Sequence, residues 1–195
     1  MRTKNPTIEN KILQEAVKEF SQKGYVGTFL EDIAKKVGIS RNPLYYYYGN
    51  KAELYIAAAN YVMEELKAGY TTIFSANKPI SKIIEEDYLY CLKNGWKIFF
   101  SSPTKAKDEP DLSKEYHAFN KWLIQMKQVV FQKAKQSGQL KNNCEVSEMI
   151  TFLYIYYYGV VDTVELAKHS KGFNADMLKN SCQDFMEIIK TRYLK

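Results

Sequence analysis

Four neighbouring polar side chains have the chemistry to read a nucleic acid. They are Arg41, Asn42, Tyr45 and Tyr46, with Tyr47 at the edge of the group. If the residues from Arg41 to about Tyr48 form a helix, Leu44 and Tyr48 share one face and these side chains point away from it. An arginine can bind the O6 and N7 atoms of guanine, an asparagine the N6 and N7 atoms of adenine, and a tyrosine hydroxyl a phosphate oxygen.

The residues just before this group predict a helix and a turn that would position it. Thr28 followed by Glu31 has the spacing of a capping box, and apolar residues then recur at helical intervals up to Val37. Gly38 suits a left-handed helix end, and Ser40 is a candidate N-cap for the next helix. The pattern therefore predicts a helix over 29–37, a short turn and a second helix over 41–48, with Pro43 in its first turn.

Two further helices are predicted on either side of this pair. Asn5 and Pro6 favour the start of a first helix over about 7–23, which Gly24 would end. Asn50 and Glu53 repeat the capping-box spacing, so a longer helix is expected over about 51–74. Its first residue, Lys51, would lie at the positive end of the helix, a position suited to a phosphate.

This segment resembles the DNA-binding domain of the TetR family of bacterial one-component regulators, over about Ile8 to Ile56. The matching positions are Ile12, Leu13, Ala16, Phe20, Gly24, Tyr25, Thr28, Ile33, Ala34, Val37, Gly38, Ile39, Ser40, Leu44, Tyr45, Tyr47, Tyr48, Lys51 and Leu54. Two departures stand out. Asn42 and Pro43 replace a small pair, which bears on the operator sequence, and Tyr48 replaces phenylalanine, so its buried hydroxyl needs a partner.

The resemblance implies roles for the individual residues. Arg41 and Asn42 are expected to contact base edges. The phosphate contacts are expected from Tyr45, Tyr46, Tyr47, Thr28 and Lys51, and Pro43 completes the DNA-binding set. The family also implies a homodimeric repressor that binds a near-palindromic, double-stranded DNA operator and is released by a small-molecule effector.

The composition is that of an ordinary globular protein with a mild excess of positive charge. The 195 residues are 46% apolar, the formal net charge is +6 and the sequence pI is about 9.0, which is compatible with a polyanionic partner. Three widely spaced cysteines favour a reduced, cytoplasmic setting. No signal peptide is expected, and the longest apolar run, 149–161, is shorter than the ~20 residues that a membrane-spanning helix needs.

The rest of the chain also predicts helices. They are expected over about 80–100, over 112–136 as one or two segments, over 145–168, and after Asn174, which would cap the last one. We therefore predict an all-α fold of about nine helices. A three-helix DNA-binding domain would cover 1–50, and a helical effector-binding and dimerisation domain would cover 51–195.

The helix expected over 145–168 is apolar on every side at its centre, which predicts that it is buried on every side. One helix of a chain of this size rarely achieves that alone. The last two helices of two copies would form a four-helix interface, and the family's usual dimer contact implies the same arrangement.

Aromatic residues in the second half could line an effector pocket, which the family usually has, although core packing accounts for most of them. With one carboxylate, the candidates are Tyr88, Trp96, Phe99, Tyr116, Phe119, Trp122, Tyr154, Tyr157, Tyr158 and Asp162. Asp87, Asp162 and Glu165 lie in apolar stretches and could bind a cation or a polar head group. Surface exposure or a structural salt bridge is the favoured outcome for each.

The sequence gives little support for an enzymatic function. His117 and His169 are the only histidines and lie far apart, and there is no glycine-rich phosphate loop, so neither an enzyme nor a bound cofactor or metal is expected. The competing interpretation is a protein–protein interaction module that uses the apolar C-terminal helices. It would lack affinity for DNA.

Overall fold

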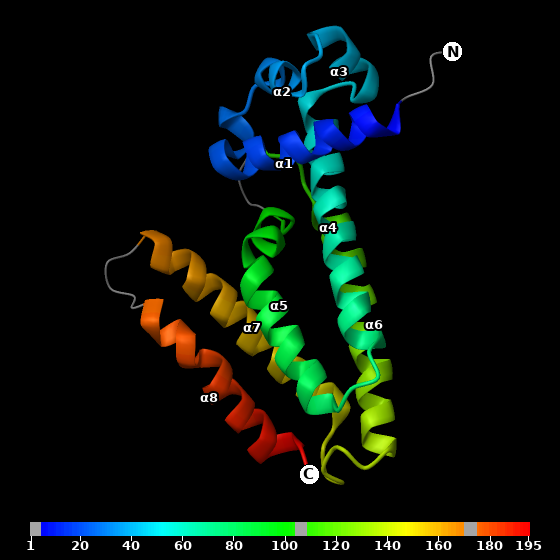
Figure 1. The fold of residues 1–195 in the computed structure, drawn as a ribbon, viewed down its shortest axis with the longest axis vertical. Helices are drawn as coiled ribbons and strands as arrows, with labels where there is room; N and C mark the ends of the chain where they lie inside the picture. The colour runs from blue at the N-terminus through cyan, green and yellow to red at the C-terminus, as the bar shows by residue number, and fades with distance from the viewer. Residues whose placement is uncertain (1–4, 104–108, 170–174) are drawn as a thin grey trace. The chain divides into compact units, whose positions relative to one another are not determined.

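The computed structural model describes residues 5–103, 109–169 and 175–195, apart from the side chains of 99, 165–169 and 175–179. Within these ranges the chain forms eight α-helices and no strand (Figure 1). The helices are α1 Pro6–Gly27, α2 Leu30–Val37, α3 Arg41–Tyr47, α4 Lys51–Ser75, α5 Ile80–Phe100, α6 Ser113–Gln136, α7 Val146–His169 and α8 Ala175–Tyr193. The predicted all-α fold is confirmed.

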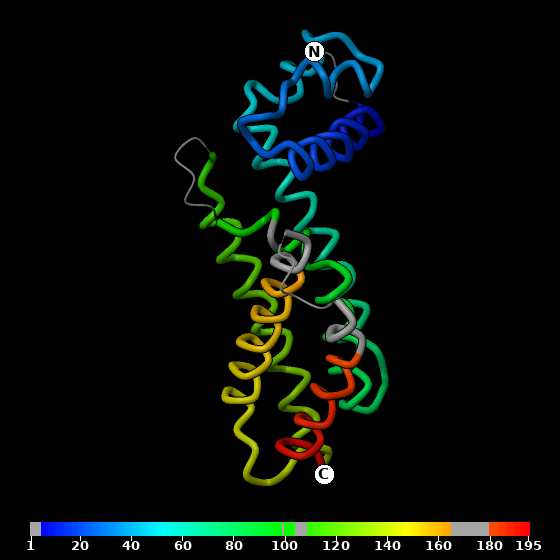
Figure 2. The backbone as a smooth tube through the Cα atoms, turned by 90° about the vertical axis from the view of Figure 1, so that its left-hand side faces the viewer, coloured from blue at the N-terminus to red at the C-terminus, as the bar shows by residue number. Residues whose placement is uncertain are grey.

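The chain divides into two compact units. The first comprises Met1–Glu65 with Phe99–Ala118, and the second comprises Leu66–Ile98 with Phe119–Lys195. Three helices, α4, α5 and α6, each begin in one unit and continue into the other along the chain. Figure 2 traces the backbone by residue number. The domain boundary predicted after residue 50 stays a prediction.

Each unit has its own apolar core. In the first unit the side chains that are 2% exposed or less include Ile12, Phe20, Ile33, Leu44 and Leu54, from all four of its N-terminal helices. In the second unit the fully buried side chains include Leu66, Ile84, Phe131, Leu153 and Phe185, one from each of α4 to α8. Burial of apolar surface on every helix supplies the main stabilisation of both units.

The first helix begins and breaks as the sequence predicts. The Asn5 side chain accepts a hydrogen bond from the Thr7 amide at 2.9 Å, and Pro6 occupies the first turn. Gly24 has φ 70° and ψ 174°, which interrupts the helical conformation, although a further turn extends to Gly27. A residue with a Cβ would be strained at this φ.

The capping box predicted for Thr28 and Glu31 is wrong. The N-cap of α2 is Phe29, and no side chain caps it. Thr28 instead turns back to α1, where its hydroxyl donates to the carbonyl oxygens of Gly24 at 2.8 Å and Glu19 at 3.2 Å. The helix starts one residue later than predicted because this hydroxyl closes the preceding turn rather than the next helix.

The remaining predicted ends of the DNA-reading segment agree with the structure. Gly38 ends α2 in the left-handed conformation, and Ser40 is the N-cap of α3, although its side chain makes no capping hydrogen bond. At the start of α4, Asn50 Oδ1 accepts from the Glu53 amide at 2.9 Å, and Glu53 Oε2 accepts from the Gly49 amide at 3.1 Å. The second capping box is therefore present, with Gly49 as its outer donor.

In the C-terminal half, α6 is one continuous helix, which gives eight helices in the described ranges rather than about nine. No glycine or proline occurs between Ser113 and Gln136 to interrupt it. The predicted cap at Asn174 lies outside the described residues. On α7, Leu153 and Tyr157 are buried but Ile155 is 70% and Tyr158 41% exposed, so burial on every side is wrong for a single copy of the chain.

Candidate nucleic-acid interface and ligand cavity

Helix α3 presents opposite faces to the core and to solvent. Leu44 is fully buried and Tyr48 is 8% exposed, whereas Arg41, Asn42, Pro43 and Tyr46 are exposed and Tyr45 and Tyr47 are half-buried. The orientation predicted from the four-residue spacing of Leu44 and Tyr48 is confirmed. The outward face therefore combines a guanidinium, a carboxamide and phenol groups.

Arg41 is held by two neighbours. Its Nε lies 3.0 Å from Glu31 Oε1 on α2, and one of its terminal nitrogens donates to Tyr45 Oη at 3.0 Å. The guanidinium also lies 5.0 Å from the centre of the Tyr45 ring. Because the planar guanidinium is a rigid fork of donors, these contacts orient it before any DNA is bound.

The tyrosines at the end of α3 fix the helix to α1. The Asn5 amide donates to Tyr47 Oη at 2.9 Å, which ties the start of α1 to α3. The hydroxyl of Tyr48, for which the sequence predicts a partner, has Glu9 as its hydrogen-bond partner. Burial, then the negative charge of Glu9, raises the pKa of Tyr48, so the phenol stays protonated and donates to the carboxylate.

Lys51 lies folded against the turn that precedes α2. Its Nζ donates to the Val26 carbonyl oxygen at 3.2 Å and lies 4.6 Å from the centre of the Tyr25 ring. Burial lowers the pKa of the Lys51 ammonium. The side chain is half-buried, and the phosphate contact expected from Lys51 stays a prediction.

Thr28 differs from the other predicted DNA contacts because it is fully buried. Its hydroxyl hydrogen is shared between two carbonyl oxygens of α1, and its amide donates to the Tyr25 carbonyl oxygen at 3.4 Å. The phosphate contact expected from Thr28 stays a prediction. In the DNA-free chain the residue joins α1 to the start of α2.

A buried carboxylate also joins α1 to α2. Glu19 is fully buried, and its carboxylate pairs with Lys23 of the same helix at 2.7 Å and with Lys36 of α2. Hydrogen bonds from Lys23 and then Lys36 lower the pKa of Glu19 against the opposing effect of burial. The ion pair of Glu19 and Lys36 thus links α1 to α2, the helix that precedes Arg41.

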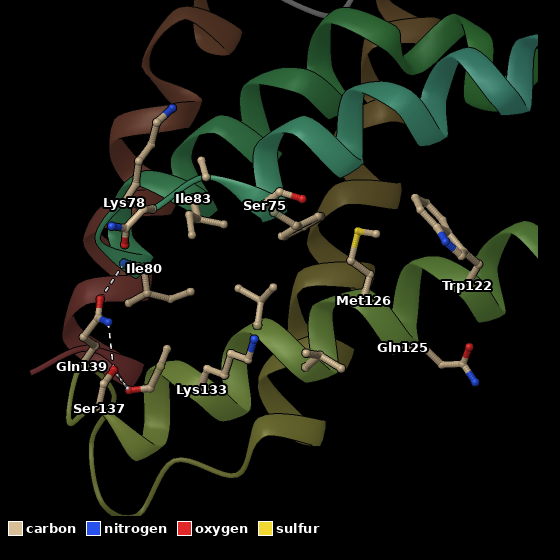
Figure 3. A pocket seen from close by; sticks show the side chains of 16 residues that line it. Ser75, Lys78, Ile80, Ile83, Trp122, Gln125, Met126, Lys133, Ser137 and Gln139 are labelled. Atoms are coloured by element: carbon tan, nitrogen blue, oxygen red, sulfur yellow. Dashed lines mark hydrogen bonds between the residues drawn. The ribbon is translucent and has the colours of Figure 1, made fainter.

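One hollow in the second unit is an open groove of about 770 Å³. Figure 3 shows Met126 and Lys133 on α6 on one side of the groove and Ile80 and Ile83 of α5 on the other, with Trp122 at the far end of α6 from these isoleucines. At one end Gln139 Oε1 accepts a hydrogen bond from the Ile80 amide at 2.8 Å. Of the aromatic residues predicted to line an effector pocket, this groove contains Trp122 alone among the described residues.

A second, small cavity of about 30 Å³ brings four of the predicted residues together. Phe119, Tyr154, Tyr157 and Tyr158 all line it, with contributions from Lys127 and Tyr70. Its volume is about that of one water molecule. The walls are therefore almost in contact, and a larger guest would have to separate them.

The other predicted pocket residues lie elsewhere. Tyr88 is buried in the core, where its hydroxyl donates to Ser181 Oγ at 2.8 Å and burial raises its pKa to about 12. Trp96 and Asp162 are exposed, and Tyr116 belongs to the first unit. The side chains of Phe99 and Glu165 lie outside the described residues.

Lys127 is the residue at this cavity that sequence reasoning missed. It is 1% exposed, and its Nζ donates to Asp87 Oδ2 at 2.7 Å, while Tyr157 Oη donates to the same oxygen at 2.9 Å. The structural salt bridge favoured for Asp87 is confirmed. A lysine on an amphipathic helix is ordinarily exposed, so the sequence around Lys127 contains no signal of its burial.

Two chemical features are absent from the described part of the chain. It holds no group of three or more histidine, cysteine or acidic side chains placed to bind a metal ion. Its helices also include none with both the length and the apolar character needed to cross a membrane.

The geometry defines a helix-turn-helix protein with a helical C-terminal part, and comparisons with known proteins show what its N-terminal segment is similar to. Residues 12–58 match the sequence profile of the bacterial regulatory proteins, tetR family. Over these residues the chain is similar to the tetR family of regulatory proteins.

Two curated relatives share the DNA-reading segment. The biofilm operon icaADBC HTH-type negative transcriptional regulator IcaR of Staphylococcus epidermidis is 50% identical over 48 residues, and that of Staphylococcus aureus strain Newman is 46% identical over 48 residues. Each match covers 25% of this chain and 26% of the relative. The likeness is confined to about a quarter of either protein.

Solved structures extend the likeness of fold over nearly the whole chain. A TetR transcriptional regulator from Chloroflexus aurantiacus has a TM-score of 0.81 at 15% identity, covering 97% of both chains. A putative transcriptional regulator from Saccharomonospora viridis, in complex with choline, has a TM-score of 0.80 at 14% identity, covering 98% of this chain and 100% of that one. At such identities the comparison establishes the fold alone.

Proposed function

We propose that this protein is a DNA-binding transcriptional repressor that reads its operator through α3. The observation that supports this most directly is the exposed face of Arg41, Asn42 and Tyr46 on a helix whose opposite face is buried. Large hydrogen-bonding groups gathered on one solvent face match the edges of bases in the major groove. Repression is the activity named for the staphylococcal relatives of this segment. A DNA operator as partner implies action in the bacterial cytoplasm.

The active species in this proposal is a homodimer formed through α7 and α8. Ile155 and Tyr158 on α7 and Ile188 on α8 are large apolar side chains that are 70%, 41% and 41% exposed, and a partner helix pair packed on them would remove them from water. Two-fold pairing of these helices would form a four-helix interface. It would present two copies of α3 to major grooves about 34–36 Å apart on a near-palindromic operator.

Release from DNA is proposed to follow effector binding in the second unit, which contains both the groove and the small cavity. Choline in a structural neighbour supports ligand binding by this fold. The α4 helix is continuous from Lys51, beside α3, to Phe74, which lines the groove. A coupling free energy of about 1–3 kcal/mol would change operator affinity about 5- to 150-fold.

A second candidate is a protein–protein interaction module. The same exposed side chains of α7 and α8 favour it, because they would suit an apolar partner other than a second copy. The two proposals differ in one property, since only the repressor needs selective affinity for DNA.

A gel-shift titration tests the proposal. The purified protein is titrated on the DNA upstream of its own gene and on random DNA of equal length, at two salt concentrations. We expect tight, selective binding to the upstream DNA and weaker, strongly salt-dependent binding to random DNA. If the two DNAs bind equally weakly and selection from genomic fragments also recovers no preferred site, the interaction module replaces the repressor.

A further inference from the structure

The buried ion pair of Asp87 and Lys127 is difficult to explain by stability alone. Asp87 on α5 is fully buried and Lys127 on α6 is 1% exposed. Removing two charges from water costs several kcal/mol for each ion, and apolar residues of similar volume often serve a core equally well. A pair kept at such a cost suggests a task other than holding α5 to α6.

The pair has hydrogen-bonding capacity to spare. An ammonium has three donors, and within the described residues Lys127 uses one of them, on Asp87 Oδ2. The other carboxylate oxygen, Asp87 Oδ1, is buried without a hydrogen-bond partner. The Tyr157 ring centre lies 4.6 Å from Lys127 Nζ, which favours the positive charge but offers no acceptor atom.

Lys127 also lines the small cavity, so its spare donors are available to a guest there. The other walls are mostly apolar or aromatic, with Tyr70, Phe119 and Leu123 among them. Aromatic walls favour a flat, apolar body, stacked or edge-on. A ligand of this cavity would therefore combine an aromatic body with one polar atom that meets the ammonium.

The charge balance decides what that polar atom is. Because Asp87 already neutralises Lys127, a ligand anion would leave one unbalanced negative charge in a buried site. A ligand cation would lie beside the ammonium and be repelled. A neutral acceptor oxygen adds no charge and takes up a donor that is otherwise unused.

We propose that this cavity binds a neutral aromatic molecule whose carbonyl oxygen accepts a hydrogen bond from Lys127. The inference rests on the proposed function in taking the second unit as the effector-binding part. The cavity of about 30 Å³ is too small for such a molecule until its walls separate. Ligand binding and a change in the packing of α6 are therefore the same event, which is what a ligand-driven switch requires.

Four probes of nearly the same shape test the class of ligand on the full chain. They are acetophenone, its apolar isostere α-methylstyrene, the anion benzoate and the cation benzamidinium. Dissociation constants are measured by ligand-observed NMR titration. We expect acetophenone to bind roughly tenfold more tightly than α-methylstyrene, which lacks the acceptor, and both ions to bind more weakly than acetophenone.

A double variant, Asp87→Asn with Lys127→Met, tests whether Lys127 donates the hydrogen bond to the ligand. It removes both charges together and keeps an acceptor for the Tyr157 hydroxyl, so no lone charge stays buried. In this variant acetophenone and α-methylstyrene should bind equally. If circular dichroism shows the variant to be unfolded, the four-probe series on the unmodified chain decides alone.

The inference is overturned if none of the probes binds, if an ion binds most tightly, if acetophenone has no advantage over α-methylstyrene, or if its advantage persists in the folded double variant. The gel shift without any probe is independent of these results. If the protein does not bind DNA selectively in the gel shift, the proposed repressor function is rejected. If it binds DNA selectively but shows no preference for acetophenone, only the proposed ligand class and the role of Lys127 are rejected.

Discussion

At the scale of single residues, Arg41 and Lys51 are the residues proposed to make two different kinds of contact with DNA. Arg41 lies on the exposed face of α3 with its guanidinium oriented by Glu31 and Tyr45. Lys51 lies at the first residue of α4, where a phosphate rather than a base is the natural partner. The two residues should therefore respond differently to substitution.

Replacing Arg41 by alanine should weaken operator binding by about 1–3 kcal/mol and relax the preference for one base, with a much smaller loss on random DNA. Replacing Lys51 by alanine is the matched control. It should weaken binding to both DNAs alike and reduce the dependence on salt by about one phosphate contact. Gel shifts across a salt series measure the affinity of each variant for both DNAs and its dependence on salt. An equal loss of affinity for operator and random DNA in Arg41→Ala would contradict base contacts by Arg41.

Residue types and spacing predicted the outward face of α3 because Leu44 and Tyr48 lie one helical turn apart and are both apolar enough to be buried. The position of Thr28 was harder to predict. A threonine three residues before a glutamate has the same spacing whether its hydroxyl caps the next helix or closes the previous turn. The burial of Lys127 could not be predicted, since it depends on a carboxylate forty residues away in the chain.

At the scale of the helices, Glu19 holds α1 and α2 together through a charge that changes with pH. Its pKa lies below the ordinary value of 4.5, so the folded state favours the ionised form. The stabilisation is therefore present above pH about 4.5 and is lost as the pH falls through the lowered pKa of the folded state. The DNA-reading unit should be sensitive to acid for this reason.

The variant Glu19→Gln should be less stable than the unmodified chain at pH 7, by roughly 1–3 kcal/mol, because Lys23 and Lys36 each lose the buried one of their two carboxylate partners. The difference should shrink below pH 4.5, where Glu19 itself becomes protonated. Urea unfolding at a series of pH values measures the difference. A constant difference at all pH values would show that the charge of Glu19 does not matter.

Close packing of α4 on α5 depends on Gly69. A Cβ at this position would lie 2.2 Å from the Tyr90 hydroxyl oxygen and 2.3 Å from the adjoining ring carbon. Real Cβ atoms do not approach other atoms so closely, so the tyrosine ring would have to move. The sequence shows only a glycine within a helical pattern, which gives no indication of what packs against it.

The variant Gly69→Ala should destabilise the protein by about 1 kcal/mol. Overpacking costs about 1–3 kcal/mol, and the better helix propensity of alanine offsets up to about 1 kcal/mol of this. Gly159→Ala in α7 is the control, since a Cβ there has no neighbour within 4 Å, and it should stabilise by up to about 1 kcal/mol. Thermal unfolding measures the stability of the two variants. If both Gly69→Ala and Gly159→Ala stabilise the protein, the predicted steric clash at Gly69 is excluded.

Helix boundaries in the C-terminal half were largely predictable, because glycine, proline and polar clusters mark most of their ends. The residues that line the small cavity were only partly predictable from the sequence. Phe119, Tyr154, Tyr157 and Tyr158 meet around one space, whereas Tyr88 is packed into the core and Trp96 is exposed. The sequence shows that a residue is aromatic but not whether it packs in a core or lines a cavity. Only the tertiary packing distinguishes these two positions.

At the scale of the whole molecule, the exposed apolar side chains of α7 and α8 bear on assembly. The sequence predicted that the centre of α7 is buried on every side, and a single copy leaves Ile155 and Tyr158 exposed. A second copy would cover them, in agreement with the reasoning from the sequence. Operator binding by a dimer should then depend on residues that never approach DNA.

The variant Ile155→Asp should raise the dimer dissociation constant at least about tenfold, because symmetry places the buried charge in the interface twice. Val129→Asp is the control, since Val129 is also exposed, at 57%, but lies on α6. Sedimentation equilibrium measures the dissociation constant of each. An unchanged dimer in Ile155→Asp, or an equal loss in both variants, would argue against the α7–α8 interface.

The ion pair between Arg41 and Glu31 also bears on how fast the protein finds its operator. On DNA that lacks a suitable base, Arg41 can keep its carboxylate partner, and the neighbouring negative charge of Glu31 weakens attraction to the phosphates. In the proposed repressor, both effects would shorten the time spent at each non-operator position and so speed sliding and hopping along DNA. A base whose acceptors replace the carboxylate ends the search, because there the arginine exchanges one partner for another without being left unpaired.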